Sequence, residues 1–191
     1  MVKNKIGKTL LKNRYLTVSC LLLLFGTILG IVALKSLPEE LFQKICILVT
    51  TQKSDFFHIF CDQFIFSEIL LSAVFLSGFS LSGHLTNGTT VLLSGIIYGI
   101  KNSASYTVFG SDHVISALIE FFIFYLFYVY LFLTMAECSF QQTQKLFLSA
   151  LKEKDEKTHY NAKSHAVKFI CFTVLLALFS VLYAYLSLLI G

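Results

Sequence analysis

The chain has 191 residues, of which 56% are hydrophobic and 14% are charged. Roughly a quarter of the residues in an ordinary soluble domain are charged, so this composition excludes a typical soluble globular protein. The net charge of +4 does not indicate nucleic-acid binding, because the basic residues are concentrated where a membrane protein carries cytoplasmic charge.

The fold class follows from the long uncharged stretches. Lipid cannot hydrogen-bond to a backbone, so such stretches cross a bilayer as helices or as closed barrels. The apolar residues run continuously and do not alternate as they do in barrel strands. The sequence therefore predicts an all-α, polytopic membrane protein with a single membrane domain over residues 1–191.

The N-terminal segment 1–14 is basic and contains no acidic residue. Residues 15–34 then carry no charge, and about 20 such residues are needed to cross a bilayer. The apolar core of a signal peptide is shorter, at roughly 7–15 residues. We therefore predict a retained first span whose basic end lies in the cytoplasm.

The next segment, 35–68, contains acidic and basic residues and two apolar helical faces. Ser36-Leu37-Pro38-Glu39 is typical of a helix start, with a serine cap and a proline in the first turn. We predict short helices on the outer membrane interface that lead into the next span. Cys46 and Cys61 share this segment, so a disulfide between them is one alternative and two free thiols are the other.

The stretch 69–100 contains no acidic residue, lysine or arginine, and its centre, 83–88, is polar. It is long for one crossing and short for two, so one long helix and a tight hairpin are both considered. The following loop, 136–168, contains six lysines, and only the hairpin places it inside with the basic N-terminus. The sequence thus predicts five spans at 15–34, 66–83, 86–101, 113–135 and 169–190, a cytoplasmic N-terminus and an extracytoplasmic C-terminus.

Glycines recur at helical spacing in two of the predicted spans. The first span has one GxxxG pair, the third span has another, and a further glycine precedes the second pair on the same helical face. Small residues allow helix backbones to approach closely in a membrane. Packing within the chain and contact with a partner protein are both compatible with this pattern. The candidates for such contacts are Gly26, Gly30, Asn87, Gly88, Gly95 and Gly99.

Polar residues near membrane depth are the other candidates, because they are costly there. We expect His84 and Asn87 in the turn of the hairpin, His113 at the outer start of the fourth span, and Glu120 inside that span. Glu120 either pairs with a neighbouring polar group or belongs to a polar cavity. The sequence has no HExxH, GxSxG or Walker lysine motif and no metal-ligand spacing, so we expect no catalytic, cofactor-binding or metal-binding residues.

Several parts of the chain occur in the order that characterises a known family. They are the basic N-terminus, the first span ending in LFGTILGIVALKSL, the outer amphipathic segment, LTNGTTVLLSGIIYG, then His113 and Glu120, and a last span after a basic loop. This order resembles the stage II sporulation protein M family (DUF95), a group of integral membrane proteins with about five spans. The resemblance covers nearly the whole chain.

The resemblance implies a function without chemistry of its own. In spore-forming bacteria the namesake holds two peptidoglycan-degrading proteins at the septal membrane during engulfment. A member would be a scaffold or assembly component of the plasma membrane, with lipid, peptidoglycan hydrolases or other envelope proteins, and a second copy as partners. The alternative is the permease subunit of an exporter with a separate ATPase, because transporters use short, broken helices at their binding sites.

Cysteine labelling tests the predicted topology. In a variant without native cysteines, a cysteine replacing Lys53 or Lys101 should react with an impermeant thiol reagent on intact cells, because both positions lie outside. A cysteine replacing Lys154 should react only after the membrane is permeabilised. Reaction at position 154 on intact cells would contradict the five-span arrangement.

Overall fold

The computed structural model describes residues 14–50, 55–109, 126–150 and 162–190. These residues contain six helices and no strand, which confirms the all-α class. The helices are α2 (Arg14–Lys35), α3 (Glu39–Thr50), α4 (Phe56–Ser77), α5 (Gly83–Phe109), α7 (Leu126–Ala150) and α8 (Ala162–Ile190).

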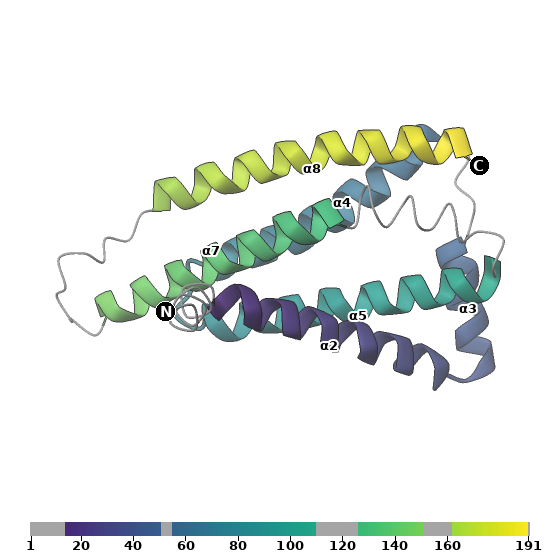
Figure 1. The fold of residues 1–191 in the computed structure, drawn as a ribbon, viewed down its shortest axis with the longest axis horizontal. Helices are drawn as coiled ribbons and strands as arrows, with labels where there is room; N and C mark the ends of the chain where they lie inside the picture. Colours follow the sequence, from purple (N-terminus) through teal and green to yellow (C-terminus); the bar gives the residue numbers. More distant parts are fainter. Residues whose placement is uncertain (1–13, 51–54, 110–125, 151–161, 191) are drawn as a thin grey trace, which may run out of the picture.

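The long helices run along one axis in three layers, with α8 on one side, α4 and α7 in the middle, and α2 and α5 on the other side (Figure 1). Helix α5 packs against α2, α3, α4 and α7, whereas α8 packs against α4 and α7. The starts of α2, α5 and α8 meet the ends of α4 and α7 at one end of the bundle, and α3 crosses the opposite end (Figure 1). The chain therefore passes back and forth between the same two ends.

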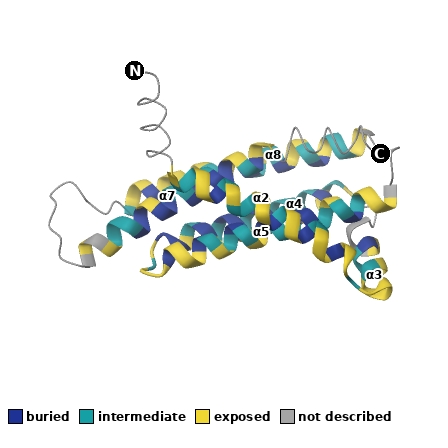
Figure 2. Cartoon of the chain, turned by 60° about the horizontal axis from the view of Figure 1, so that its bottom comes forward, coloured by how far each residue is buried: buried dark blue, intermediate teal, exposed yellow. Residues whose placement is uncertain are grey.

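Three of the described helices, α2, α4 and α8, are long and apolar enough to cross a membrane. Their outward faces carry exposed leucine, isoleucine and valine, such as Leu21 and Ile28 on α2 and Ile170 and Leu178 on α8. Exposed positions follow the whole length of α8 (Figure 2). Soluble proteins rarely expose contiguous apolar faces of this kind, whereas lipid covers them favourably. These features are those of a membrane protein.

The segment 69–100 is a hairpin and not one long helix, but its turn lies at 78–82, before the position that we predicted. Backbone N–H groups of Gly78, Phe79 and Ser80 donate to carbonyl groups three residues earlier, which tightens the end of α4. A Cβ on Gly83 would overlap the carbonyl oxygen of Ser77, so only glycine allows the chain to reverse this tightly.

The prediction that His84 and Asn87 lie in the turn is wrong, because both belong to α5. The polar residues here fit a helix since their side chains have partners in it or beside it. The His84 ring stacks on Phe140 of α7 and on Tyr15 of α2, at centroid distances of 5.4 and 6.0 Å. The Thr90 hydroxyl donates to the Thr86 carbonyl oxygen, one turn earlier.

Other boundaries also differ from the sequence predictions. The Ser36 hydroxyl donates to the carbonyl oxygen of Ala33 at 2.8 Å, so it closes α2 and does not cap α3. The second predicted interfacial helix is continuous with α4. The predicted loop 136–168 is largely helical, because α7 extends to Ala150 and α8 begins at Ala162. No disulfide joins Cys46 and Cys61.

The backbones of α2 and α5 touch at four of the predicted glycines. A Cβ on Gly26 would overlap the Leu92 carbonyl oxygen, and one on Gly30 would overlap that of Ile96. From the other side, a Cβ on Gly95 or Gly99 would overlap a carbonyl oxygen of α2. The two GxxxG pairs therefore lie against each other within the chain.

Gly88 belongs to the same face of α5 but lies beyond this tight contact. A Cβ built on it would meet the Leu22 Cδ1 atom at 3.7 Å, which is ordinary van der Waals distance. The position therefore has room for alanine.

These two kinds of glycine give a matched pair of variants. We expect Gly99→Ala to lower the free energy of unfolding by about 1–3 kcal/mol, because the added methyl group must push the two backbones apart. Gly88→Ala should leave it nearly unchanged. Unfolding of the purified protein by SDS titration, followed by helical circular dichroism, measures both. Equal stability of the two variants would mean that α2 and α5 are not in backbone contact.

Candidate functional site

Asn87 is the sequence-predicted polar candidate that the structure places most clearly. It is fully buried between α5 and α7, and its Nδ2 group donates to the Ala136 carbonyl oxygen at 2.8 Å. This bond joins the start of α5 to the middle of α7, which is a packing role. His113 and Glu120, the two predicted intramembrane candidates, lie outside the described residues.

Glu68 is a carboxyl group inside a candidate membrane span that the sequence predictions missed. It lies near the middle of α4, about 18 Å from Phe56 at the usual rise of ~1.5 Å per residue. Sequence analysis placed Glu68 at the end of the charged segment 35–68 and within the predicted span 66–83, and did not name it as a candidate. The signal that could have identified it is the apolar sequence close to Glu68 on both sides, Phe64-Ile65-Phe66 before it and Ile69-Leu70-Leu71 after it.

Two hydroxyl groups hold the Glu68 carboxyl. The Thr173 hydroxyl of α8 donates to its Oε1 atom at 2.9 Å, and Ser72, one turn along α4, is a second hydrogen-bond partner. No Lys, Arg or His side chain is among the contacts that the described part of the chain gives Glu68. An unpaired charge in the middle of a span costs at least ~2.5 kcal/mol. No described cation lies beside this carboxyl group to offset that cost.

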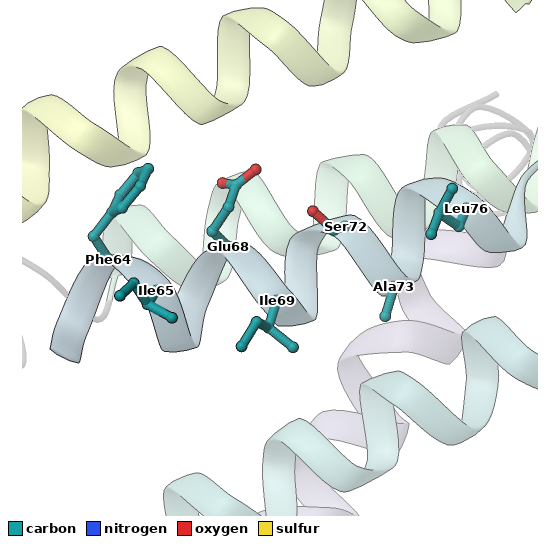
Figure 3. Close-up of a pocket in the computed structure, with 7 residues that line it drawn as sticks. All are labelled: Phe64, Ile65, Glu68, Ile69, Ser72, Ala73 and Leu76. Atoms are coloured by element: carbon teal, nitrogen blue, oxygen red, sulfur yellow. The ribbon is translucent and has the colours of Figure 1, made fainter. Parts of the chain in front are cut away.

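Glu68 lines a groove along one face of α4 (Figure 3). Phe64 and Glu68 point toward α8, whereas Ile69 and Ala73 point away from it, toward α5 (Figure 3). The groove is open, because Ile69 is 61% exposed and Leu76 is 64% exposed. Its complete lining is Phe64, Ile65, Glu68, Ile69, Ser72, Ala73 and Leu76.

The opposite face of α4 is packed into the core. Leu71 and Val74 are buried there in one cluster with Tyr98 of α5 and with Tyr128 and Phe132 of α7. The Tyr98 and Tyr128 rings meet edge to face at a centroid distance of 5.5 Å. Glu68 lies at the border between this core and the groove, because it interacts electrostatically with Tyr128 and also lines the groove.

His165 is a second buried titratable group, at the end of the bundle where α8 begins. Its Nε2 atom lies 3.3 Å from the Phe75 carbonyl oxygen and 3.4 Å from the Ser139 hydroxyl oxygen. Its ring stacks on Phe75 and meets Phe79 edge-on. Through these contacts, His165 of α8 joins its own helix and α7 to the end of α4. Sequence analysis missed it because it falls in the predicted loop.

The arrangement offers a surface for binding. Within the described ranges no group of three or more His, Cys, Asp and Glu side chains could hold a metal ion. The groove combines an apolar wall, two small residues and one carboxyl group, which together can accept an apolar ligand that carries a hydrogen-bond donor.

Substitutions at Glu68 and Thr173 test the bond between α4 and α8. Thr173→Val and Glu68→Leu should each lower stability by about 1 kcal/mol, the scale of hydrogen bonds between membrane helices. Glu68→Gln should lose less, because an amide oxygen still accepts from Thr173. Glu137→Leu is the control, since Glu137 bonds to Gln141 of its own helix at 3.2 Å. Chemical unfolding in detergent measures all four, and equal effects at Glu137 and Glu68 would contradict the assigned bond.

Comparisons of the chain with protein-family models, curated proteins and solved structures found no match.

Proposed function

We propose that this protein is a non-enzymatic scaffold or assembly component of the plasma membrane that holds other membrane or envelope proteins. The groove along α4 carries the proposal, because it is an open, largely apolar face at membrane depth with a carboxyl group at its edge. The glycines at 26, 30, 95 and 99 meet one another inside the chain, so they are not available to a partner, whereas this face of α4 is.

The proposed orientation has five spans, a cytoplasmic N-terminus and an extracytoplasmic C-terminus. Basic residues at the start of α2, near the end of α7 and at the start of α8 support it, because these helix ends meet at one end of the bundle (Figure 1). The hydrogen bond from Tyr15 to Gln144, at 2.8 Å, joins two of these ends. Cytoplasmic loops carry an excess of lysine and arginine, so this end would face the cytoplasm.

The resemblance to the stage II sporulation protein M family supports the same function. It suggests envelope proteins such as peptidoglycan hydrolases as the partners and sporulation as one setting. A scaffold needs a stable framework and an accessible face, and the α2–α5 contact and the α4 groove are suited to these two roles.

The second candidate function is the permease subunit of a transporter. Glu68 favours it, because a carboxyl group within a span is the kind of group that proton- and cation-coupled transporters use. The broken mid-chain helices that first suggested transport are not present in the described residues, where α4 and α5 are continuous over 22 and 27 residues. Scaffolding is therefore the better-supported proposal.

Co-purification in mild detergent separates the two functions. A tagged chain expressed in its host at native level should retain peptidoglycan hydrolases or other envelope proteins in stoichiometric amounts. The matched control is Gly99→Ala, which should lose these partners because the bundle itself is distorted. Recovery of a stoichiometric ATPase in place of envelope proteins would contradict the scaffold and favour the permease.

A further inference from the structure

We infer that the α4 groove binds a single membrane-spanning helix of a partner protein, and that this helix presents a lysine or arginine to Glu68. The inference rests on the proposed scaffold function and specifies the partner. It follows from the shape of the groove, from the Glu68 Oε2 atom, which has no hydrogen-bond partner among the described residues, and from the positions of the described basic residues.

The groove has the dimensions of a helix contact. Its lining extends from Phe64 to Leu76, which is about 18 Å or three helical turns. Ser72 and Ala73 are small, so another backbone can approach α4 closely at its middle. Larger side chains, Ile65, Ile69 and Leu76, lie around this point and can pack against the partner's apolar residues.

The chemistry of Glu68 selects the partner. An ionised carboxylate has about four acceptor positions, and Thr173 and Ser72 occupy two of them. Thr173 can release Glu68 without leaving its own hydroxyl unpaired, because a helical threonine can donate to a carbonyl one turn earlier. Thr134 does so with the Tyr130 carbonyl oxygen at 2.7 Å. Glu68 is therefore free to turn toward a stronger donor in the groove.

None of the described basic side chains of this chain supplies that donor. The described basic side chains lie toward the ends of the helices or in α3, and none is among the contacts of Glu68. A second copy of this chain bound through the same groove would place Glu68 against Glu68, and like charges at such a distance repel. The described basic residues are Arg14, Lys35, Lys44, Lys101, Lys145, Lys163 and Lys168.

The test uses the full-length protein in phosphatidylcholine vesicles with synthetic membrane-spanning peptides. Three peptides of about 20 leucine and alanine residues differ only at the central position, which is Lys, Leu or Glu. Fluorescence energy transfer from labelled protein to labelled peptide gives the apparent affinity. The lysine peptide should bind at least about tenfold more tightly than the leucine peptide, which corresponds to ~1.4 kcal/mol. The glutamate peptide should bind no better than the leucine peptide.

Variants assign the binding to the groove. Glu68→Gln keeps a hydrogen-bonding group but removes the charge, so it should abolish the preference for lysine. Ala73→Phe fills the middle of the groove and should weaken binding of all peptides, provided that its melting temperature stays near that of the wild type. Glu137→Gln and Leu178→Phe are controls, because these residues lie on other helices, α7 and α8, and should leave binding unchanged.

Each result decides the inference separately from the proposed function. Equal binding of the lysine and leucine peptides, or a lysine preference that survives Glu68→Gln, would overturn the inference while co-purified envelope proteins would still support the scaffold. Selective binding of the lysine peptide, abolished by Glu68→Gln, supports the inference. If the protein co-purified only with an ATPase, the scaffold function would be contradicted, whereas the preference of the groove for a lysine-bearing helix would still be supported.

Discussion

The direct contact between the backbones of α2 and α5 is the constraint on which the rest of the structure depends. Lipid tails are as apolar as leucine side chains, so helices in a membrane associate through close packing and hydrogen bonds, with no hydrophobic driving force between them. Four glycines, Gly26, Gly30, Gly95 and Gly99, bring the two backbones together over about two turns. The pair then forms one firm layer of the bundle.

This layer fixes the position of the remaining helices. One side of α5 packs against α2. On its other sides, Asn87 therefore bonds to α7, and Tyr98 packs into the core that α4 and α7 share. Helix α4 then has one face in that core, one hydrogen bond to α8 through Glu68, and one face without a partner in the described chain. The groove is therefore a consequence of how the other helices are arranged.

Asn87, His165 and Glu68 each have one polar atom that is bonded and another that has no hydrogen-bond partner among the described residues. Asn87 and His165 bond to backbone or hydroxyl groups of neighbouring helices and serve the packing of the bundle. Glu68 is the one of the three that lines the groove, and its Oε2 atom is buried without a hydrogen-bond partner while Oε1 accepts from Thr173. An incompletely satisfied acid on an accessible face is where a functional contact is expected, because polar groups at this depth are costly to maintain.

Sequence analysis predicted the helical class and the glycine contacts because both depend on short-range patterns, continuous apolar runs and GxxxG spacing. It could not show that the two glycine pairs meet each other, since that depends on which helices become neighbours. The turn was misplaced because 78–83 and 83–88 both contain glycines and polar residues, and only the close approach of Gly83 to Ser77 distinguishes them. Glu68 was missed because a charge in the sequence suggests an exposed segment, and its Thr173 partner is far along the chain. The predictions for His113 and Glu120 stay untested.

Chemical cross-linking between α2 and α5 tests the central claim most directly. The measurement uses two pairs of cysteines in a background without native cysteines and a short thiol-specific cross-linker in native membranes. Cysteines at Leu22 and Gly88 should link rapidly, because the Leu22 side chain lies 3.7 Å from a Cβ built on Gly88. Cysteines at Leu21 and Gly88 should not, since Leu21 is 61% exposed on the outward face of α2. Equal linking of the two pairs, or none at Leu22, would contradict the α2–α5 contact.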